Sequence, residues 1–302
     1  MSAVRAKGAI LTHNCEMKRI LIAGCGDIAL RVAPLLRERY RLFGLARNVA
    51  RHDALSMAGI TPMPGDLDAR KSLDRLAELA DIVLHFAPPP NTGSVDPRTR
   101  NLLAALTRGR LPQQLVYIST SGVYGDCGGE QVTETHPLNA QNPRARRRVD
   151  AEKQIRAWAR KNGVHASILR VPGIYAADRL PLQRLQQGTP AIVADEDSYT
   201  NHIHADDLAR CVVAAIRHAK PNRVVHTSDD SNLKTGEYFD AVADAYHLPR
   251  PPRISRAEAQ SVLSPMMLSF MNESRRLTND RMKQELKVVL RYPTVADALK
   301  KL

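Results

Sequence analysis

Hydroxyl and guanidinium side chains, which can bind or stabilise an oxygen atom, lie in two neighbouring stretches of the chain. An apolar strand at 115–118 runs into Thr120 and Tyr124, and further along a helical pattern carries Arg144 and Arg148. A guanidinium stays protonated at physiological pH, so the arginines can stabilise an oxyanion or bind an anionic substrate but cannot act as acids. Tyr124, by its place shortly after Thr120, is the candidate acid of this group.

The helix that carries the two arginines is predicted from its first turn and its periodicity. Asn142-Pro143 is a favourable N-cap and first-turn pair. One face of the helix then contains residues 144, 148, 152, 155, 158 and 159, the last three of which are apolar. That face looks inward, so we expect Arg148, and with it Arg144, to point at a cleft, while residues 146 and 147 lie off it. The alternative is that Arg148 only forms an i, i+4 salt bridge with Glu152.

A glycine-containing turn follows the first apolar strand. Residues 19–23 lead into Gly24-Cys25-Gly26-Asp27-Ile28-Ala29, and a helical pattern begins at once. Such a G-x-G-x-x-A turn lets the backbone approach a pyrophosphate, which then binds the amides at the helix N-terminus. We therefore predict a dinucleotide site that includes Gly24, Gly26, Asp27, Ile28 and Ala29. A tight turn without a ligand is the alternative.

The end of the second strand indicates which dinucleotide is bound. An acid is expected here for the ribose hydroxyls of NAD, whereas an arginine suits the 2′-phosphate of NADP. This strand ends in Ala46-Arg47-Asn48, and an arginine can bind a phosphate through two parallel hydrogen bonds. NADP is the predicted cofactor and NAD the second choice. Alternatively, Arg47 is an exposed arginine of a basic protein.

Strand-like and helical patterns alternate through the first half of the chain. Strands are predicted at 19–23, 41–46, 60–64, 82–86, 115–119 and 166–170. Helices are predicted between them at 27–40, 50–58, 69–79, 97–107 and 144–161. Such alternation is typical of a parallel sheet with helices on both faces. The predicted fold class is α/β, a doubly wound Rossmann fold with a smaller, mainly helical C-terminal lobe.

The loss of this regularity after residue 170 sets the predicted domains. Residues 17–170 form the dinucleotide-binding domain, and a helix at 206–218 with a strand at 223–226 makes 201–230 pack back onto it. Residues 171–200 and 231–302 then form a substrate-binding lobe, in which a methionine-rich stretch at 266–271 is expected to fill a core. Residues 1–16 are expected to be a disordered N-terminal extension, with Met17 as an alternative start.

Composition and spacing argue against several classes of protein. The chain has 302 residues, and none of its apolar runs approaches the roughly twenty residues of a membrane span, so we expect a soluble, cytoplasmic protein without a membrane partner.

The four cysteines lack metal-site spacing and are expected to be free thiols. No metal site is predicted, because the pair His202 and His204 lacks a clear third ligand. We expect His204 to pack or hydrogen-bond and Asp206 to cap a helix.

The basic character of the chain favours an anionic ligand. The net charge is +13, and excess positive charge attracts phosphates of any kind. Aromatic residues make up only 4% of the chain, and none is interleaved with the basic cluster at 144–148, where a single-strand binder would need stacking platforms. A nucleic-acid partner therefore ranks below a small anionic substrate.

Together, these motifs resemble the extended short-chain dehydrogenase/reductases, a family of sugar-nucleotide epimerases, dehydratases and reductases. The stretch from Thr120 to Gly125 resembles the family's Ser/Thr-x-x-Val-Tyr-Gly, and the following helix stands where the family has Pro-Tyr-x-x-x-Lys-x-x-x-Glu. Here Arg144 occupies the Tyr position and Arg148 the Lys position, and none of the eight tyrosines has a lysine four positions on. Ala23 also replaces the first glycine of the family's turn. The chain thus resembles an atypical member.

The resemblance implies roles for several residues. Thr120 would hydrogen-bond the substrate oxygen, and Arg148 would replace the lysine that holds the nicotinamide ribose. Asp66 and Leu67 match the family's adenine-contacting pair, although Asp66 is alternatively a helix N-cap. The resemblance places the rest of the cofactor cleft at Ala87, Pro172 and Ile174. Segments 201–209 and 274–281 resemble family segments of the substrate lobe.

The expected function is an NAD(P)-dependent oxidoreductase or epimerase reaction without the usual tyrosine acid. Its substrate would be a small, anionic, sugar-nucleotide-like molecule that reacts at a carbonyl or hydroxyl group. The alternative is a non-catalytic NADP-binding sensor or scaffold, as in superfamily members that lost the tyrosine. A homodimer is compatible with either function.

Overall fold

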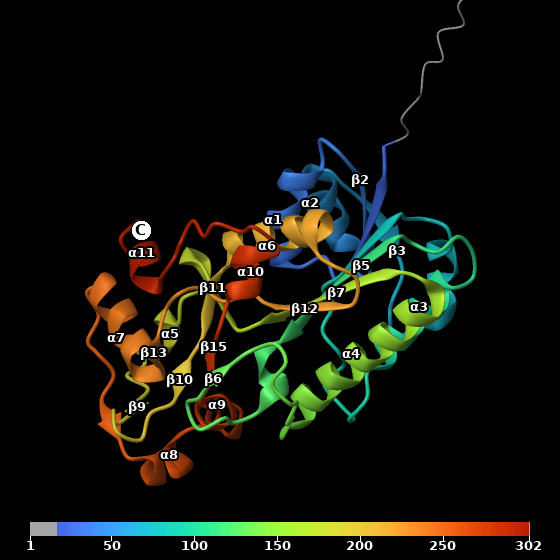
Figure 1. Ribbon diagram of the computed structural model, residues 1–302. Helices are drawn as coiled ribbons and strands as arrows, with labels where there is room; N and C mark the ends of the chain where they lie inside the picture. Colours follow the sequence, from blue (N-terminus) through green and yellow to red (C-terminus); the bar gives the residue numbers. More distant parts are fainter. Residues whose placement is uncertain (1–16, 302) are drawn as a thin grey trace, which may run out of the picture.

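A seven-stranded parallel sheet forms the centre of the molecule (Figure 1). The computed structural model describes residues 17–301, so the extension and alternative start predicted for residues 1–16 lie outside the described residues. In the order along the sheet, its strands are β12 (Arg223–His226), β7 (His165–Val171), β5 (Gln114–Thr120), β4 (Ile82–His85), β1 (Arg19–Ala23), β2 (Arg41–Ala46) and β3 (Ile60–Pro64). All seven strands were predicted to within one residue at each end.

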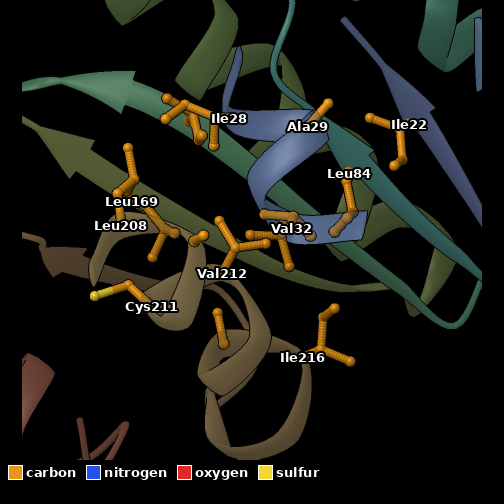
Figure 2. Packing of buried hydrophobic residues seen from close by; sticks show 14 of the residues in the cluster. Ile22, Ile28, Ala29, Val32, Leu84, Leu169, Leu208, Cys211, Val212 and Ile216 are labelled. Atoms are coloured by element: carbon orange, nitrogen blue, oxygen red, sulfur yellow. The ribbon is translucent and has the colours of Figure 1, made fainter. Parts of the chain in front are cut away.

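Helices cover both faces of this sheet, as the doubly wound prediction requires. The covering helices are α1 (Asp27–Leu36) and α6 (Ala205–His218) on one face, and α3 (Pro97–Leu106) and α4 (Pro143–Asn162) on the other. Figure 2 shows Val32 of α1 beside Val212 of α6, and both belong to the same buried cluster as Ile22 of β1. Leu21, which precedes Ile22 in β1, belongs to the core on the α3 and α4 side, because successive strand residues point to opposite faces. The predicted fold class is confirmed.

Most of the remaining elements are short and follow β7 in the chain. The paired short strands are β6 (Gln131–Val132) with β15 (Arg276–Leu277), β8 (Gly173–Tyr175) with β11 (His202–His204), β9 (Ala191–Ile192) with β14 (Arg253–Ile254), and β10 (Tyr199–Thr200) with β13 (Leu233–Lys234). The other α-helices are α2 (His52–Met57), α5 (Leu182–Gln186), α7 (Thr235–Ala245), α8 (Arg256–Val262), α9 (Pro265–Met271), α10 (Asp280–Gln284) and α11 (Val295–Leu299). In Figure 1, α7 and α8 lie at the end of the molecule opposite the edge strand β3.

Three predicted helices differ from those observed. The segment at 69–79 is a 3-10 helix, η2 (Arg70–Leu76), in which Leu73 and Leu76 both reach the core, since a repeat of three residues keeps them on one side. The helix predicted at 50–58 is divided into η1 (Val49–Arg51) and α2. The helix predicted at 27–40 ends at Leu36, its last buried residue. The other 3-10 segments are η3 (Ser121–Tyr124) and η4 (Ala177–Arg179).

The methionine-rich stretch packs as expected. Met271 is buried and Met267 half-buried, and both contact a small core with Ile192 and Leu263. The core-filling prediction is confirmed for these two side chains; that of Met266 lies outside the described set. Across residues 17–301 no helix combines the length and apolar composition that a bilayer crossing needs.

Candidate functional site

A cavity of about 560 Å³ opens at the carboxyl ends of β1, β2 and β4. The strand order reverses between β1 and β4, and ligands of doubly wound sheets bind at such a switch point. Most of the predicted cofactor residues line it: Gly24, Gly26, Asp27, Ile28, Ala29, Arg47, Asp66, Leu67, Ala87, Arg148 and Ile174. We call it the glycine-turn cavity. The structure places the remaining predicted cofactor residue, Pro172, beside a second cavity instead.

The two glycines of the turn differ in what they make possible. Gly24 has φ +106°, and a Cβ there would lie 2.3 Å from the backbone nitrogen of Ala87, so only glycine lets these two backbone segments approach. Gly26 is the N-cap of α1 without a side-chain cap, and a Cβ there would meet no atom within 4 Å. The uncapped N-terminus of α1 thus faces open space in the cavity, which fits a pyrophosphate.

Asp27, the first residue of α1, is engaged by two arginines. It accepts hydrogen bonds from Arg31 Nε at 2.9 Å and from Arg179 Nη1 at 2.8 Å. Partial burial favours the neutral acid, but the hydrogen bonds from Arg179 and Arg31 outweigh it and lower the pKa of Asp27. Arg179 itself lines the glycine-turn cavity. Sequence reasoning missed it, because nothing local in η4 indicates a contact with a turn so far away in the chain.

Arginines gather at the end of β2. The Arg47 side chain is 69% exposed and lies 3.9 Å from Asp68, a carboxylate that Arg98 already holds with two hydrogen bonds of 2.6 and 2.8 Å. Arg51, one turn further on, lines the same cavity and was not predicted. Arg47 is thus only weakly paired and can bind a phosphate together with Arg51.

Asp66 lines the same cavity but does not cap a helix. Its Oδ1 accepts a hydrogen bond from the Asp68 amide at 3.0 Å, and the N-cap of η2 is Ala69. The alternative prediction of a helix cap at Asp66 is therefore wrong.

Arg148 is held at the wall of the glycine-turn cavity. Its Nη1 donates to the Ile118 carbonyl at 2.8 Å and to the Tyr117 hydroxyl at 3.1 Å. Tyr117 is fully buried, and burial raises its pKa to about 12, so it remains a neutral partner for the guanidinium. The alternative of an Arg148 salt bridge with Glu152 is wrong, because the Glu152 carboxylate pairs with Arg170 and accepts a hydrogen bond from Ser119 instead.

Those groups form a buried network between β5, β7 and α4. Arg170 Nη2 donates to Glu152 Oε2 at 2.7 Å, and Ser119 Oγ donates to Glu152 Oε1 at 2.6 Å. Arg170 Nη1 also donates to the Tyr124 hydroxyl at 2.6 Å, which lies 2.6 Å from His226 Nε2. The network fixes the strand end that carries the predicted catalytic residues.

Tyr124 is placed by this network inside the protein. It is fully buried, lines neither cavity, and has its pKa raised to about 12 by burial. This position suits a structural hydrogen bond between strands more than contact with a substrate. The role of Tyr124 as an acid stays a prediction that the geometry does not favour.

A second cavity, of about 170 Å³, adjoins the ends of β5 and α4. Its lining includes Thr120, Ser121, Gly122, Asn142, Arg144, Pro172, Gly173, Tyr199, Thr200, Asn201, Ser269, Glu273 and Arg275. We call it the Thr120 cavity. It brings Thr120 and Arg144 together as predicted, and burial and the nearby charge of Arg148 lower the pKa of Arg144. Tyr199, in β10, and Glu273, between α9 and β15, were missed because both are far from residue 120 in the chain.

Arg147 and the two histidines of β11 make packing contacts and hydrogen bonds within the protein. Arg147 is buried and donates to the Gly93 carbonyl at 2.6 Å, away from both cavities. His202 stacks on Tyr238 at a ring distance of 4.1 Å. His204 accepts the Asp206 amide at 3.2 Å and so caps α6, which confirms its hydrogen-bonding role and makes the Asp206 cap prediction wrong. The described residues contain no cluster of His, Cys, Asp or Glu suited to a metal ion.

Comparison with known proteins gives a consistent result. Residues 20–226 match the family described as "NAD dependent epimerase/dehydratase family". A dTDP-glucose 4,6-dehydratase of Mycolicibacterium smegmatis is 28% identical over 200 residues, which cover 58% of this chain and 57% of that protein. The chain therefore matches little more than half the length of this curated relative.

Two solved structures extend the comparison over most of the chain. A conserved protein of unknown function from Silicibacter pomeroyi is 28% identical, with a TM-score of 0.79, over 94% of this chain and 98% of that one. UDP-glucuronic acid 4-epimerase from Bacillus cereus shares the fold, with a TM-score of 0.75 and 17% identity over 93% of this chain and 96% of the other.

Proposed function

Because this chain belongs to the NAD-dependent epimerase/dehydratase family, we propose that it is an NADP-linked oxidoreductase or epimerase. Its substrate would be a small, anionic, sugar-nucleotide-like molecule that reacts at a carbonyl or hydroxyl group. The observation that carries this proposal is that the two cavities lie next to each other, at the end of β5 and the start of α4. Ile118 and Arg148 line the glycine-turn cavity, while Thr120 and Arg144 line the Thr120 cavity.

The glycine-turn cavity would hold the dinucleotide. The N-terminus of α1 would bind the pyrophosphate, Arg47 and Arg51 the 2′-phosphate, and Arg148 the nicotinamide ribose. Adenine would lie against Asp66 and Leu67, and Ala87 and Ile174 would line the rest of the site. The bound nicotinamide would supply hydride transfer, which no side chain can provide.

The Thr120 cavity would hold the reacting part of the substrate. The Thr120 hydroxyl would hydrogen-bond the reacting oxygen, and Arg144 would stabilise negative charge on the substrate. A sugar nucleotide fits the basic surroundings, and sugar nucleotides are named for the similar dTDP-glucose dehydratase and UDP-glucuronic acid epimerase. A substrate of this kind carries phosphates, in accord with the net charge of +13.

Titration of the protein with NADPH and NADH, followed by nicotinamide fluorescence, tests the cofactor. We expect tighter binding of NADPH, and we expect Arg47→Asp to reduce the preference for NADPH by about 10- to 100-fold, since a charge-assisted phosphate contact is lost. Arg39→Asp, at an exposed position after α1, is the matched control. No binding of either dinucleotide would refute the site assignment.

A non-catalytic NADP-binding sensor is the second candidate function. The burial of Tyr124 and the presence of Arg144 at the usual tyrosine position favour it, because neither residue offers a phenol to the Thr120 cavity. A panel of ketones and nucleotide-linked sugars, incubated with NADPH or NADP⁺, separates the two functions. Turnover supports the enzyme, and tight NADPH binding with no turnover across the panel supports the sensor.

A further inference from the structure

The Thr120 cavity contains a carboxylate that sequence reasoning did not consider. Among its described lining residues, the groups with ionisable side chains are Arg144, Tyr199, Glu273 and Arg275. The two arginines cannot exchange a proton near neutral pH. We propose that Glu273 is the proton-transferring residue of this cavity, in place of the missing tyrosine. This inference rests on the proposed function of the two cavities.

Gly122 creates the space in which Glu273 and Thr120 can meet one substrate oxygen. A Cβ built on Gly122 would lie 3.6 Å from Thr120 Oγ1 and 3.9 Å from Glu273 Oε2. Both oxygens therefore border the same small space, which glycine leaves free of a side chain. An oxygen atom of a substrate bound there would be close to the hydroxyl that orients it and to a carboxylate able to take its proton.

The Glu273 carboxylate is held in a fixed orientation. Its side chain is 10% exposed, Oε1 accepts from Asn142 Nδ2 at 2.9 Å, and Oε2 accepts from Arg275 Nη1 at 2.9 Å. Asn142 is itself fixed, because its Oδ1 caps α4 by accepting the Ala145 amide. A carboxylate has about four acceptor positions, so these two donors leave acceptor capacity for a substrate hydroxyl.

Tyr199 is the rival group in the same cavity, but its ring serves as a packing surface. The Arg276 guanidinium lies 5.0 Å from the ring centroid and Lys234 Nζ lies 5.8 Å from it. A Cβ on Gly129 would lie 3.1 Å from a carbon of the ring, so the segment just before β6 packs closely against it. These contacts give Tyr199 a cation–π role that does not need its hydroxyl.

The proposed step is a proton transfer. When a substrate CH–OH group is oxidised to a carbonyl, its carbon-bound hydrogen would leave as hydride to the oxidised nicotinamide that the proposed function assigns, while the O–H bond breaks and the proton passes to Glu273. In the reverse direction the protonated carboxyl returns the proton to the oxygen. Thr120 and Arg144 stabilise the oxygen during the transfer.

The test compares Glu273→Gln with Tyr199→Phe and with Glu285→Gln. Gln keeps the shape and the hydrogen bond from Asn142 but cannot take a proton. For oxidation of an active panel substrate with NADP⁺, in which Glu273 must accept a proton, we expect Glu273→Gln to lower kcat by about 10²- to 10⁴-fold and to remove the acidic limb of the pH profile of kcat. NADPH affinity should remain within about twofold of the wild type, because Glu273 lines the other cavity. Glu285, in an ion pair with Arg223 outside both cavities, controls for loss of a carboxylate.

Each outcome bears on the inference. An unchanged acidic limb in Glu273→Gln, or loss of turnover only in Tyr199→Phe, would overturn the role of Glu273 and leave the proposed function standing. A wild type that binds NADPH but turns over no panel member would overturn both. Rescue of Glu273→Ala by formate, with restored kcat but unchanged NADPH affinity, would support proton transfer directly, and a failure of rescue in a folded variant would count against it.

Discussion

The glycine-turn cavity and the Thr120 cavity open at the same edge of the sheet but draw on different parts of the chain. The first is lined mainly by residues that directly follow β1, β2, β3 and β4. The second combines the end of β5 with the start of α4 and with residues at 172–173, 199–201 and 269–275, which lie in or beside β8, β10 and α9. A site at strand ends follows from the sheet itself, whereas a site between segments far apart in the chain depends on each long-range contact.

The two cavities also differ in what supports them. Backbone contact holds the glycine turn, where Ala87 N donates to the Ala23 carbonyl at 2.8 Å. Buried charges hold the Thr120 cavity, through the Arg170–Glu152 pair beneath it and the Glu273–Arg275 pair in its wall. We therefore expect substitutions that remove a charge to affect the Thr120 side most, and substitutions that add a methyl group to affect the glycine turn most.

Removal of the buried charge of Glu152 should have the largest effect on stability. Glu152 and Arg170 have side chains 2% and 3% exposed, and Glu152→Gln would leave the guanidinium without its counter-ion. We expect the free energy of unfolding to fall by about 3–5 kcal/mol, measured by urea denaturation.

The control for this prediction is Glu285→Gln. It breaks the partly exposed pair with Arg223 and should lower the free energy of unfolding by less than about 1 kcal/mol. Equal losses in the two variants would show that the network beneath the Thr120 cavity is not special.

The same contrast explains how much could be predicted from the sequence. The strands, the glycine turn and Arg47 depend on residues close together in the chain, and the sequence placed the strands to within one residue. Arg179, in η4, and Glu273, between α9 and β15, reach the cavities from segments whose positions are set by contacts between distant parts of the chain. Tyr124 shows the opposite error: its distance along the chain from Thr120 is short, but η3 turns its ring into the protein.

A matched pair of alanine substitutions tests the glycine turn. Gly24→Ala places a Cβ 2.3 Å from a backbone atom at φ +106°, so we expect a loss of about 2–3 kcal/mol in the free energy of unfolding. Gly26→Ala meets no protein atom within 4 Å and should leave stability within about 1 kcal/mol of the wild type.

The NADPH affinities of the same pair separate packing from ligand binding. In Gly26→Ala we expect an NADPH dissociation constant raised by about tenfold or more, because the new methyl group would occupy the space before the α1 N-terminus. Unchanged affinity in the folded Gly26→Ala variant would argue against a pyrophosphate at this turn.

His202 links the segment that carries Asn201 to the pH dependence of stability. Burial lowers the pKa of His202 to about 3, whereas an unfolded histidine titrates near 6.5. Between these values the unfolded chain binds a proton that the folded protein does not, so stability falls as the pH decreases from about 6.5 toward 3. His202→Phe keeps the aromatic contact with Tyr238 and should flatten this decline by about 1.4 kcal/mol per pH unit between pH 6 and 4.

Unfolding free energies at several pH values measure the slope, and His218→Gln, at an exposed position, gives the effect of losing a solvated imidazole. A slope in His202→Phe equal to that of the wild type would mean that His202 becomes accessible before the protein unfolds, and that the loop beside the Thr120 cavity opens independently of the sheet.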